Sequence, residues 1–195
     1  MNELNSNLPY GATPIDADEM AQLIPKHIKY LSELNELEQK NISNAILWMS
    51  RSRKKDFFSI SFIMKLHNKM FEDVWNWSGK FRLSNKNIGC EWNQVPSEIK
   101  NLLDNVLFWI ENKTYNLDEI GARLHHKLVY IHPFPNGNGR HARLYCDAFM
   151  LLQKSTPFSW GNMRVDQQST RKEYIEALRK ADKKDYTELI KFVRS

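Results

Sequence analysis

Two glycines separated by a single asparagine interrupt an otherwise helical pattern in the C-terminal half of this chain. The stretch reads HPFPNGNGRHAR and covers residues 132–143. The segments on both sides of it carry apolar residues at helical spacing. Because glycine and asparagine tolerate left-handed backbone, the pattern predicts a tight turn between two helices, with several amides pointing the same way. The chain has only seven glycines in 195 residues, so their concentration here is informative.

Helical periodicity runs through most of the chain, and the expected fold class is all-α. The predicted helices cover residues 32–50, 59–74, 96–113, 117–132, 140–154, 170–181 and 185–194. Ser32 is the expected N-cap of the first helix, and Pro96 suits the first turn of the third. Residues 75–95 lack a helical period and predict a loop with a small β-hairpin, here called the flap, at about residues 79–95. Residues 1–31 are expected to form an N-terminal arm and residues 32–195 a single helical domain.

Composition narrows the classes of function. A chain with 42% hydrophobic and 26% charged residues is typical of soluble globular proteins. Its apolar runs fall short of the roughly 18 residues that cross a bilayer, and no signal-peptide pattern opens it. Cys90 and Cys146 lie in unrelated contexts, which favours a reducing cytoplasm over a disulfide framework. The net charge of +5 is compatible with nucleotide or nucleic-acid binding but establishes neither.

The residues around the two glycines are of types that bind anions. A helix that begins near Gly139 leaves its first amides unpaired and carries partial positive charge there. Arg140 and Arg143 lie three positions apart, so both can contact an anion from the same side of the helix. His132 adds a titratable imidazole at the edge of this predicted phosphate site. A plain capped turn beside a buried structural histidine is the alternative, but the joint occurrence with Phe134 and two arginines favours the phosphate site.

The segment HPFPNGNGRHAR resembles the signature of the Fic family, His-x-Phe-x-Asp/Glu-Gly-Asn-Gly-Arg-x-x-Arg. Every fixed position matches except Asn136, which stands where the family usually has an acid. The segment LHNKMFEDVWNWSGKFR, residues 66–82, resembles the chain leading into the active-site flap of that family. Residues 8–25 and 34–45 resemble the small Fic subgroup called mobile mystery protein B. Together these resemblances cover most of the chain and imply a Fic-type helical bundle with its flap beside an anion-binding loop.

The resemblance implies a protein nucleotidyltransferase of the AMPylation type. Such an enzyme transfers a nucleoside monophosphate, usually AMP from ATP with Mg²⁺, to a Ser, Thr or Tyr hydroxyl of a target protein. By the same resemblance His132 is the catalytic base, Phe134 is the core anchor of the loop and Asn136 is a weak magnesium ligand. The residues implied to bind the nucleotide phosphates are Gly137, Asn138, Gly139, Arg140 and Arg143.

Further roles follow from the resemblance. The flap residues implied to dock the target are Asn87, Ile88, Gly89, Cys90, Glu91 and Trp92. The related Doc branch carries lysine where Gly139 stands and transfers a terminal phosphate, so glycine here favours nucleotidyl transfer. Many Fic proteins inhibit themselves with the glutamate of a Ser/Thr-x-x-x-Glu-Gly/Asn helix, set against the second arginine of the motif. Ser32 and Glu36 have this spacing, but Leu37 replaces the final Gly/Asn, and a solvated surface carboxylate is the alternative.

Two other classes of function stay open. The first is a binding module that keeps the phosphate site but has lost catalysis through Asn136. The second is a DNA-associated partner protein of a mobile element, suggested by the basic charge and by the helix-turn-helix protein often encoded beside such proteins. A zinc site is not expected, because the histidines are irregularly spaced and lack companion acids or cysteines.

Overall fold

The computed structural model describes residues 17–28, 30–51, 56–161 and 167–195, and these residues form helices joined by short loops. The elements are α1 (Ala17–Ala21), α2 (Leu31–Ser50), α3 (Ile60–Phe71), the 3₁₀ helix η3 (Trp92–Gln94), α4 (Val95–Glu111), α5 (Leu117–Ile131), α6 (Asn138–Leu152), α7 (Gln167–Asp182) and α8 (Thr187–Val193). Strand-type pairing in the described part is limited to an isolated bridge between Leu23 and Trp75. The expected all-α class is confirmed.

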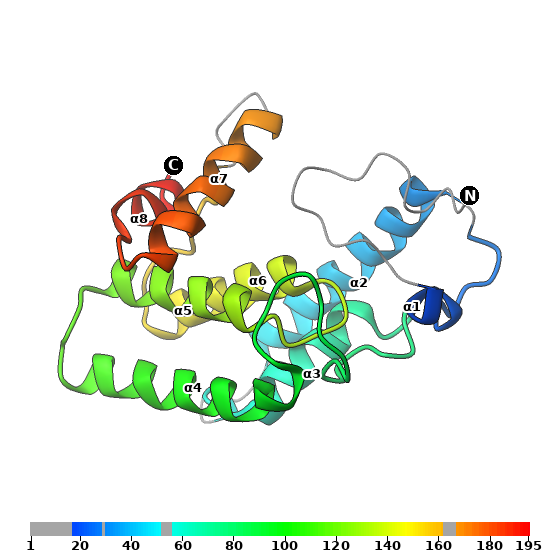
Figure 1. Cartoon of the computed structure of the whole chain (residues 1–195), viewed down its shortest axis with the longest axis horizontal. Coiled ribbons are helices and arrows are strands. Elements are labelled where there is room, and N and C mark those ends of the chain that lie inside the picture. Colours follow the sequence, from blue (N-terminus) through cyan, green and yellow to red (C-terminus); the bar gives the residue numbers. More distant parts are fainter. Residues whose placement is uncertain (1–16, 29, 52–55, 162–166) are drawn as a thin grey trace.

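The helices α5 and α6 form the centre of the molecule. They pack against each other, α4 packs on α5, and α3 contacts both α6 and α2. The helices α7 and α8 form a pair, and α8 contacts α5. Figure 1 shows the green segment that leads into α4 lying beside the turn between α5 and α6. None of the helices in the described part combines the length and the apolar character that a bilayer crossing requires.

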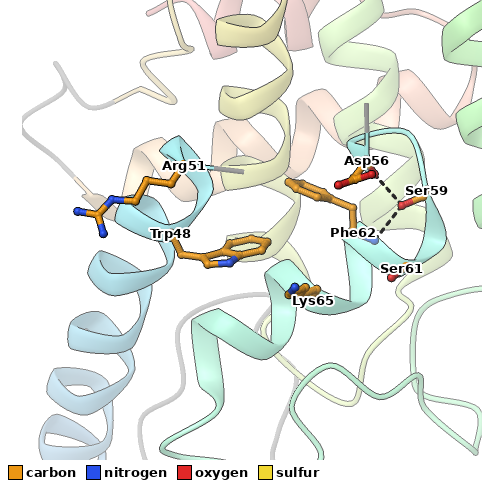
Figure 2. A pocket seen from close by; sticks show the side chains of 7 residues that line it. All are labelled: Trp48, Arg51, Asp56, Ser59, Ser61, Phe62 and Lys65. Carbon is orange, nitrogen blue, oxygen red and sulfur yellow. Dashed lines mark hydrogen bonds between the residues drawn. The ribbon is translucent and has the colours of Figure 1, made fainter. Parts of the chain in front are cut away.

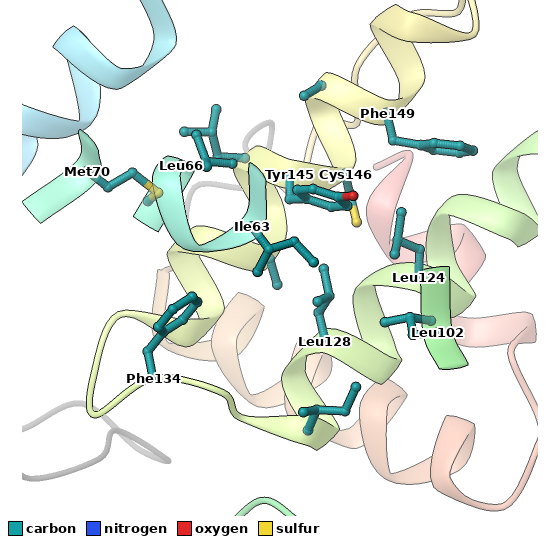
Figure 3. Close-up of a cluster of buried hydrophobic side chains, with 14 of the residues drawn as sticks. Ile63, Leu66, Met70, Leu102, Leu124, Leu128, Phe134, Tyr145, Cys146 and Phe149 are labelled. Carbon is teal, nitrogen blue, oxygen red and sulfur yellow. The ribbon is translucent and has the colours of Figure 1, made fainter. Parts of the chain in front are cut away.

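An apolar face on α3 explains why this segment is helical and where it packs. The buried side chains of this face are Phe62, Ile63, Leu66, Met70 and Phe71, at spacings that place them on one side of a helix. Ser59 caps the helix, because its hydroxyl accepts a hydrogen bond of 3.1 Å from the Phe62 amide. Figure 3 shows α3 side chains gathered with Leu124 and Leu128 of α5 and with Tyr145 of α6 in one core.

The observed helix starts differ from the predicted ones at two places. The helix α2 begins at Leu31, so the prediction of Ser32 as its N-cap was wrong. The cap position is Tyr30, whose amide donates to the Glu33 carboxylate at 3.1 Å. The helix α4 begins one residue before Pro96, which leaves the proline in the first turn where it was expected.

Part of the predicted arm packs against the helices. Residues 1–16 lie outside the described part of the chain, and α1 follows them. Leu23 and Ile28 are buried in the core, and the Ile24 amide donates to the Val74 carbonyl at 2.9 Å. The division into an arm and a domain at residue 31 stays a prediction.

The flap differs from its prediction, because the β-hairpin expected within residues 79–95 is not formed. Residues 79–91 contain no strand and lead directly into η3. Side chains bond the main-chain groups that a strand ladder would have paired. The Arg82 guanidinium donates to the Cys90 carbonyl, and the Asn85 side chain accepts a hydrogen bond of 2.9 Å from the Trp92 amide. From here on, the flap means residues 79–92.

Three histidines are deeply buried: His67 on α3, His125 on α5 and His141 on α6. Burial lowers the pKa of His125 to about 3 and that of His141 to about 4, and it holds the pKa of His67 well below its ordinary value. These imidazoles are therefore neutral in the folded protein near neutral pH. The unfolded chain, in contrast, protonates its histidines below about pH 6.5.

We expect the free energy of unfolding to fall as the pH drops from about 6.5 towards about 4, because the unfolded state then binds more protons than the folded state. Each of these buried histidines contributes a loss of about 1.4 kcal/mol per pH unit over that range. Asp147 opposes the trend, since burial raises its pKa to about 6 and the folded protein then holds a proton that the unfolded chain releases. Urea unfolding at several pH values between about 7.5 and 5 measures the slope. A constant free energy across this range would contradict the expectation.

Candidate functional site

The turn between α5 and α6 contains two residues in the left-handed conformation. His132, which follows the last residue of α5, has φ 52°, and Gly137, which precedes α6, has φ 75°. Gly137 must be glycine for a second reason, since a Cβ there would lie 2.6 Å from the Phe71 ring. At His132 a full side chain occupies a conformation that costs roughly 1–2 kcal/mol. Strain of this kind is concentrated at functional sites.

Gly139 has no structural reason of this kind to be glycine. It lies in the first turn of α6, is exposed, and a Cβ there would meet no atom within 4 Å. The first amides of a helix lack acceptors within the helix and attract negative charge. The space left by the missing side chain of Gly139 is therefore where an anion can approach these amides.

Asn138 closes the turn with both ends of its side-chain amide. Its Oδ1 accepts a hydrogen bond of 2.9 Å from the Phe134 amide, and its Nδ2 donates to the Phe134 carbonyl at 2.8 Å. Asn138 is 3% exposed, so its side chain serves the turn, while its main chain begins α6. Figure 3 shows Phe134 extending from the turn into the core.

His67 lies beneath the turn and joins it to the flap. Its ring stacks on the Phe134 ring with centroids 3.6 Å apart. Its Nδ1 accepts a hydrogen bond of 2.9 Å from the Gly79 amide, so the ring proton lies on Nε2, which donates to the Asn136 carbonyl at 3.1 Å. His67 was not predicted as a site residue from the sequence. Its position on the apolar face of α3, directly after Leu66, was the available signal.

His132 is a neutral, buried imidazole without an ordinary hydrogen bond. Its side chain is 6% exposed, and neither ring nitrogen is bonded in the described part of the chain. Burial lowers its pKa to about 4, the nearby Val129 carbonyl opposes this, and the positive charges of Arg82 and Lys86 add to it. The Val129 carbonyl therefore favours the charged ring without forming a hydrogen bond of normal geometry. The ring is costly to bury unpaired and is free to accept a proton from a ligand.

Arg140 is held by α2. Its guanidinium donates to the Glu38 carboxylate at 2.5 Å, and the other carboxylate oxygen accepts a hydrogen bond of 2.8 Å from the Trp75 indole. The Arg140 guanidinium also lies 5.0 Å from the centroid of the Phe71 ring. Glu38 was not predicted as a site residue from the sequence. The signal was its position on the buried stripe of α2, which also contains Leu34.

Arg143 has different neighbours. Its guanidinium lies 4.9 Å from the Tyr174 ring centroid and 5.6 Å from that of Trp160. Both rings belong to the C-terminal part of the chain, and Tyr174 is on α7. The two motif arginines therefore start from the same helix but have separate neighbours, which come from α2 and α3 for Arg140 and from beyond α6 for Arg143.

Glu36 lies on the exposed surface of α2. It borders a hollow of about 210 Å³ together with His27, Ile28, Glu33 and Leu37. In this structure the carboxylate that α2 presents to a motif arginine belongs to Glu38, and the arginine is the first of the motif. The inhibitory role of Glu36 stays a prediction.

Asn136 uses its side chain within the turn. Its Oδ1 accepts a hydrogen bond of 2.7 Å from the Gly137 amide, which is therefore not open to a ligand. An amide oxygen is a neutral ligand for a hard cation such as Mg²⁺. Elsewhere in the described residues, no group of three or more His, Cys, Asp or Glu side chains is arranged to hold a metal ion.

The flap lies against His132. Gly89, with φ 113°, approaches so closely that a Cβ there would lie 2.9 Å from the His132 Cβ. The Arg82 amide donates to the Pro133 carbonyl at 3.0 Å. Of the predicted docking residues, Asn87, Ile88, Gly89, Glu91 and Trp92 are exposed and Cys90 is half-buried. The structure thus brings the flap and the turn together.

A larger hollow, of about 600 Å³, lies away from these residues. Figure 2 shows its lining of Trp48, Arg51, Asp56, Ser59, Ser61, Phe62 and Lys65, from the end of α2 and the start of α3. It contains no residue of the turn or the flap. Its lining residues Arg51 and Asp56 are separated in the sequence by residues 52–55, which lie outside the described part of the chain, so no ligand is assigned to it. The chemistry of the turn, and not the size of a hollow, identifies the candidate site.

Comparison with known proteins relates the chain to one family. Residues 57–150 match the model of the family described as the Fic/DOC family. The chain is 25% identical over 169 residues to Protein adenylyltransferase Fic of Aedes aegypti, which covers 85% of this chain and 33% of that protein. It is 27% identical over 146 residues to Protein adenylyltransferase fic-1 of Caenorhabditis elegans, covering 73% and 28%. The chain thus spans about a third of the length of these curated relatives.

Solved structures share the fold. Fic-1 of C. elegans (residues 134–508 of that protein) has a TM-score of 0.65 at 25% identity, covering 79% of this chain and 46% of that one. BepC of Bartonella tribocorum, solved with bound AMPPNP, has a TM-score of 0.67 at 16% identity, covering 87% and 89%. The mobile mystery protein B subgroup and a helix-turn-helix partner stay predictions. Residues 57–150, which carry the turn and the flap, are thus similar to the Fic/DOC family, and the chain shares its fold with solved Fic proteins.

Proposed function

We propose that this protein is a nucleotidyltransferase that transfers AMP from ATP to a hydroxyl side chain of a target protein. The observation that carries the proposal is the neutral, buried and unpaired imidazole of His132, in the same turn as the open first residues of α6. Relatives named protein adenylyltransferase, at 23–27% identity, support this activity at the level of the family. BepC shares the fold and holds AMPPNP, so ATP is the first nucleotide to test.

In the proposed reaction the phosphates lie at the N-terminus of α6, where main-chain amides and the guanidinium groups of Arg140 and Arg143 neutralise their charge. The imidazole of His132 takes the proton of the target hydroxyl. The hydroxyl oxygen then forms a bond to the α-phosphorus of ATP, and the bond from that phosphorus to pyrophosphate breaks. Pyrophosphate leaves, and His132 later releases the proton to solvent. Positioning and charge neutralisation supply most of the catalysis in such a displacement.

Magnesium fits this site through one neutral ligand. The amide oxygen of Asn136 would hold it, and the nucleotide phosphates would supply further oxygens. When bound, the ion neutralises phosphate charge.

One observation favours a second function, a nucleotide-binding module without transfer. Asn136 replaces the usual acid, and its amide oxygen already accepts the Gly137 hydrogen bond.

Replacement of His132 tests the proposed base. The protein is incubated with labelled ATP, GTP or UTP, magnesium and a cell lysate, and the transferred label is measured. His132→Ala should lower transfer by roughly 10²–10⁴-fold. The nucleotide Kd should change by only a few-fold, because the amides and arginines bind the phosphates. His27→Ala, at an exposed histidine, is the matched control and should label normally. Near-normal labelling by His132→Ala would exclude it as the base.

Substitutions at Gly139 test whether this glycine is needed for anion binding, whereas a substitution at Gly137 tests a glycine that is needed for folding. We expect Gly139→Ala and Gly139→Leu to fold with no loss of stability, because a side chain there meets no neighbouring atom. Nucleotide affinity and transfer should fall in step with the size of the side chain, by about tenfold or more for leucine, because it occupies the anion's space. Gly137→Ala should instead lower the melting temperature, since its Cβ meets Phe71. An unchanged nucleotide affinity in Gly139→Leu would show that the anion does not bind beside residue 139.

Asn136→Asp tests the metal ligand. An aspartate adds a negative charge, so the magnesium concentration that gives half-maximal transfer should fall by about tenfold, while the same target residue is labelled. Magnesium titrations of the transfer rate for both proteins measure this. Coincident curves would show that residue 136 does not contact the ion. An inactive parent that aspartate activates would favour the binding-module function.

A further inference from the structure

Arg82 is among the most buried side chains of the molecule, although it carries a full charge. It is 2% exposed, and its guanidinium donates to four main-chain carbonyls. Nε donates to the His132 carbonyl at 2.6 Å, and Nη2 donates to the Ile131 carbonyl at 3.3 Å. Nη1 donates to the Ser84 carbonyl at 2.9 Å, and Nη2 also donates to the Cys90 carbonyl.

These acceptors come from two segments, the end of α5 and the flap. The carbonyls of Ile131 and His132 belong to the C-terminus of α5, where carbonyls lack helical partners and attract positive charge. Burial lowers the pKa of Arg82, and the nearby Cys90 and Glu91 oppose this. Several charge-assisted hydrogen bonds offset the cost of burying a guanidinium. A rigid, planar fork of donors is suited to bridging two segments in this way.

Gly89 shows how tightly the two segments fit. A Cβ at this residue would lie 2.8 Å from Nη2 of Arg82, 2.9 Å from the His132 Cβ and 3.2 Å from the Ile131 carbonyl oxygen. The flap main chain is therefore in contact with both the guanidinium and the histidine. Movement of the flap relative to the end of α5 must break hydrogen bonds of Arg82.

We propose that Arg82 is a positioning residue, which holds the flap and the main chain of His132 together as one unit. If the flap docks the target, this unit fixes the target hydroxyl relative to the His132 imidazole. The role in catalysis rests on the proposed function, whereas the coupling of the flap to α5 does not. Small displacements of reacting groups lower transfer rates strongly, so loss of the coupling should reduce kcat more than nucleotide binding.

The two cysteines provide a readout that needs no enzymatic activity. Cys90 is half-buried in the flap, and Cys146 is fully buried on α6. Burial raises the pKa of Cys90, and the positive charge of Arg82 opposes this. Arg82→Lys keeps the charge near the thiol but cannot reach four carbonyls with a single ammonium. A change in the reactivity of the Cys90 thiol in this variant therefore reports a change in the position of the flap and not a loss of charge.

The test measures the rate at which a maleimide labels each cysteine of the folded protein, with the labelled residue identified by mass spectrometry. Arg82→Lys should accelerate labelling of Cys90 by about tenfold or more and leave Cys146 unchanged, because the flap opens locally. Arg51→Lys, at an exposed arginine, is the matched control and should change neither rate. An unchanged rate at Cys90 would overturn the proposal. Equal acceleration at both cysteines would also overturn it, since Arg82 would then only stabilise the whole fold.

Gly89→Ala disturbs the contact of the flap with Arg82 and His132 but keeps the guanidinium. It therefore tests the coupling of the flap to α5 if Arg82→Lys does not fold. It should likewise accelerate labelling of Cys90 alone, and no acceleration would overturn the proposal. In the transfer assay, Arg82→Lys should lower kcat by about tenfold or more while the ATP Kd stays within a few-fold. An unchanged kcat would overturn the positioning role. A parent protein that transfers no nucleotide would refute the proposed function, and the Cys90 rate would still test the coupling.

Discussion

The stacking of Phe134 on the neutral ring of His67 is the contact on which the candidate site depends. One imidazole joins three segments, because it lies on α3, accepts from the Gly79 amide at the start of the flap and donates to the Asn136 carbonyl in the turn. Both bonds can exist together only when the ring is neutral with its proton on Nε2. Deep burial keeps it so, by lowering its pKa. The core, through His67, therefore fixes the position of the turn.

Much of this architecture could be predicted from the sequence. The helices from α2 to α8 agree with the apolar periodicity to within a few residues, because their buried positions recur at helical spacing. The turn was predicted because Gly137 and its neighbours form a short, local pattern. The β-hairpin was predicted wrongly, since the main chain of the flap bonds side chains such as Arg82 and Asn85 instead of a second strand.

The residues that the sequence analysis missed share one property. Glu38, His67 and Arg82 are polar side chains on buried surfaces, and each bonds a segment far away in the chain. Periodicity treats such residues as interruptions of an apolar face, since it contains no information about distant partners. The pair formed by Glu38 and Arg140 spans 102 positions, so only the folded chain reveals it. Glu36, two residues before Glu38, matched the Ser/Thr-x-x-x-Glu spacing of the inhibitory helix. It lies on the exposed surface of α2.

The neighbours of the two motif arginines lead to a broader consequence. Residues 57–150 match the family, yet Glu38 precedes that span, and Trp160 and Tyr174 follow it. The charge that balances Arg140 and the aromatic rings beside Arg143 are thus supplied by segments that flank residues 57–150. Two chains with the same twelve-letter signature can therefore differ in how strongly they bind phosphate, if their flanks differ. In this chain the signature marks the candidate site, whereas segments outside residues 57–150 supply groups that contact its two arginines.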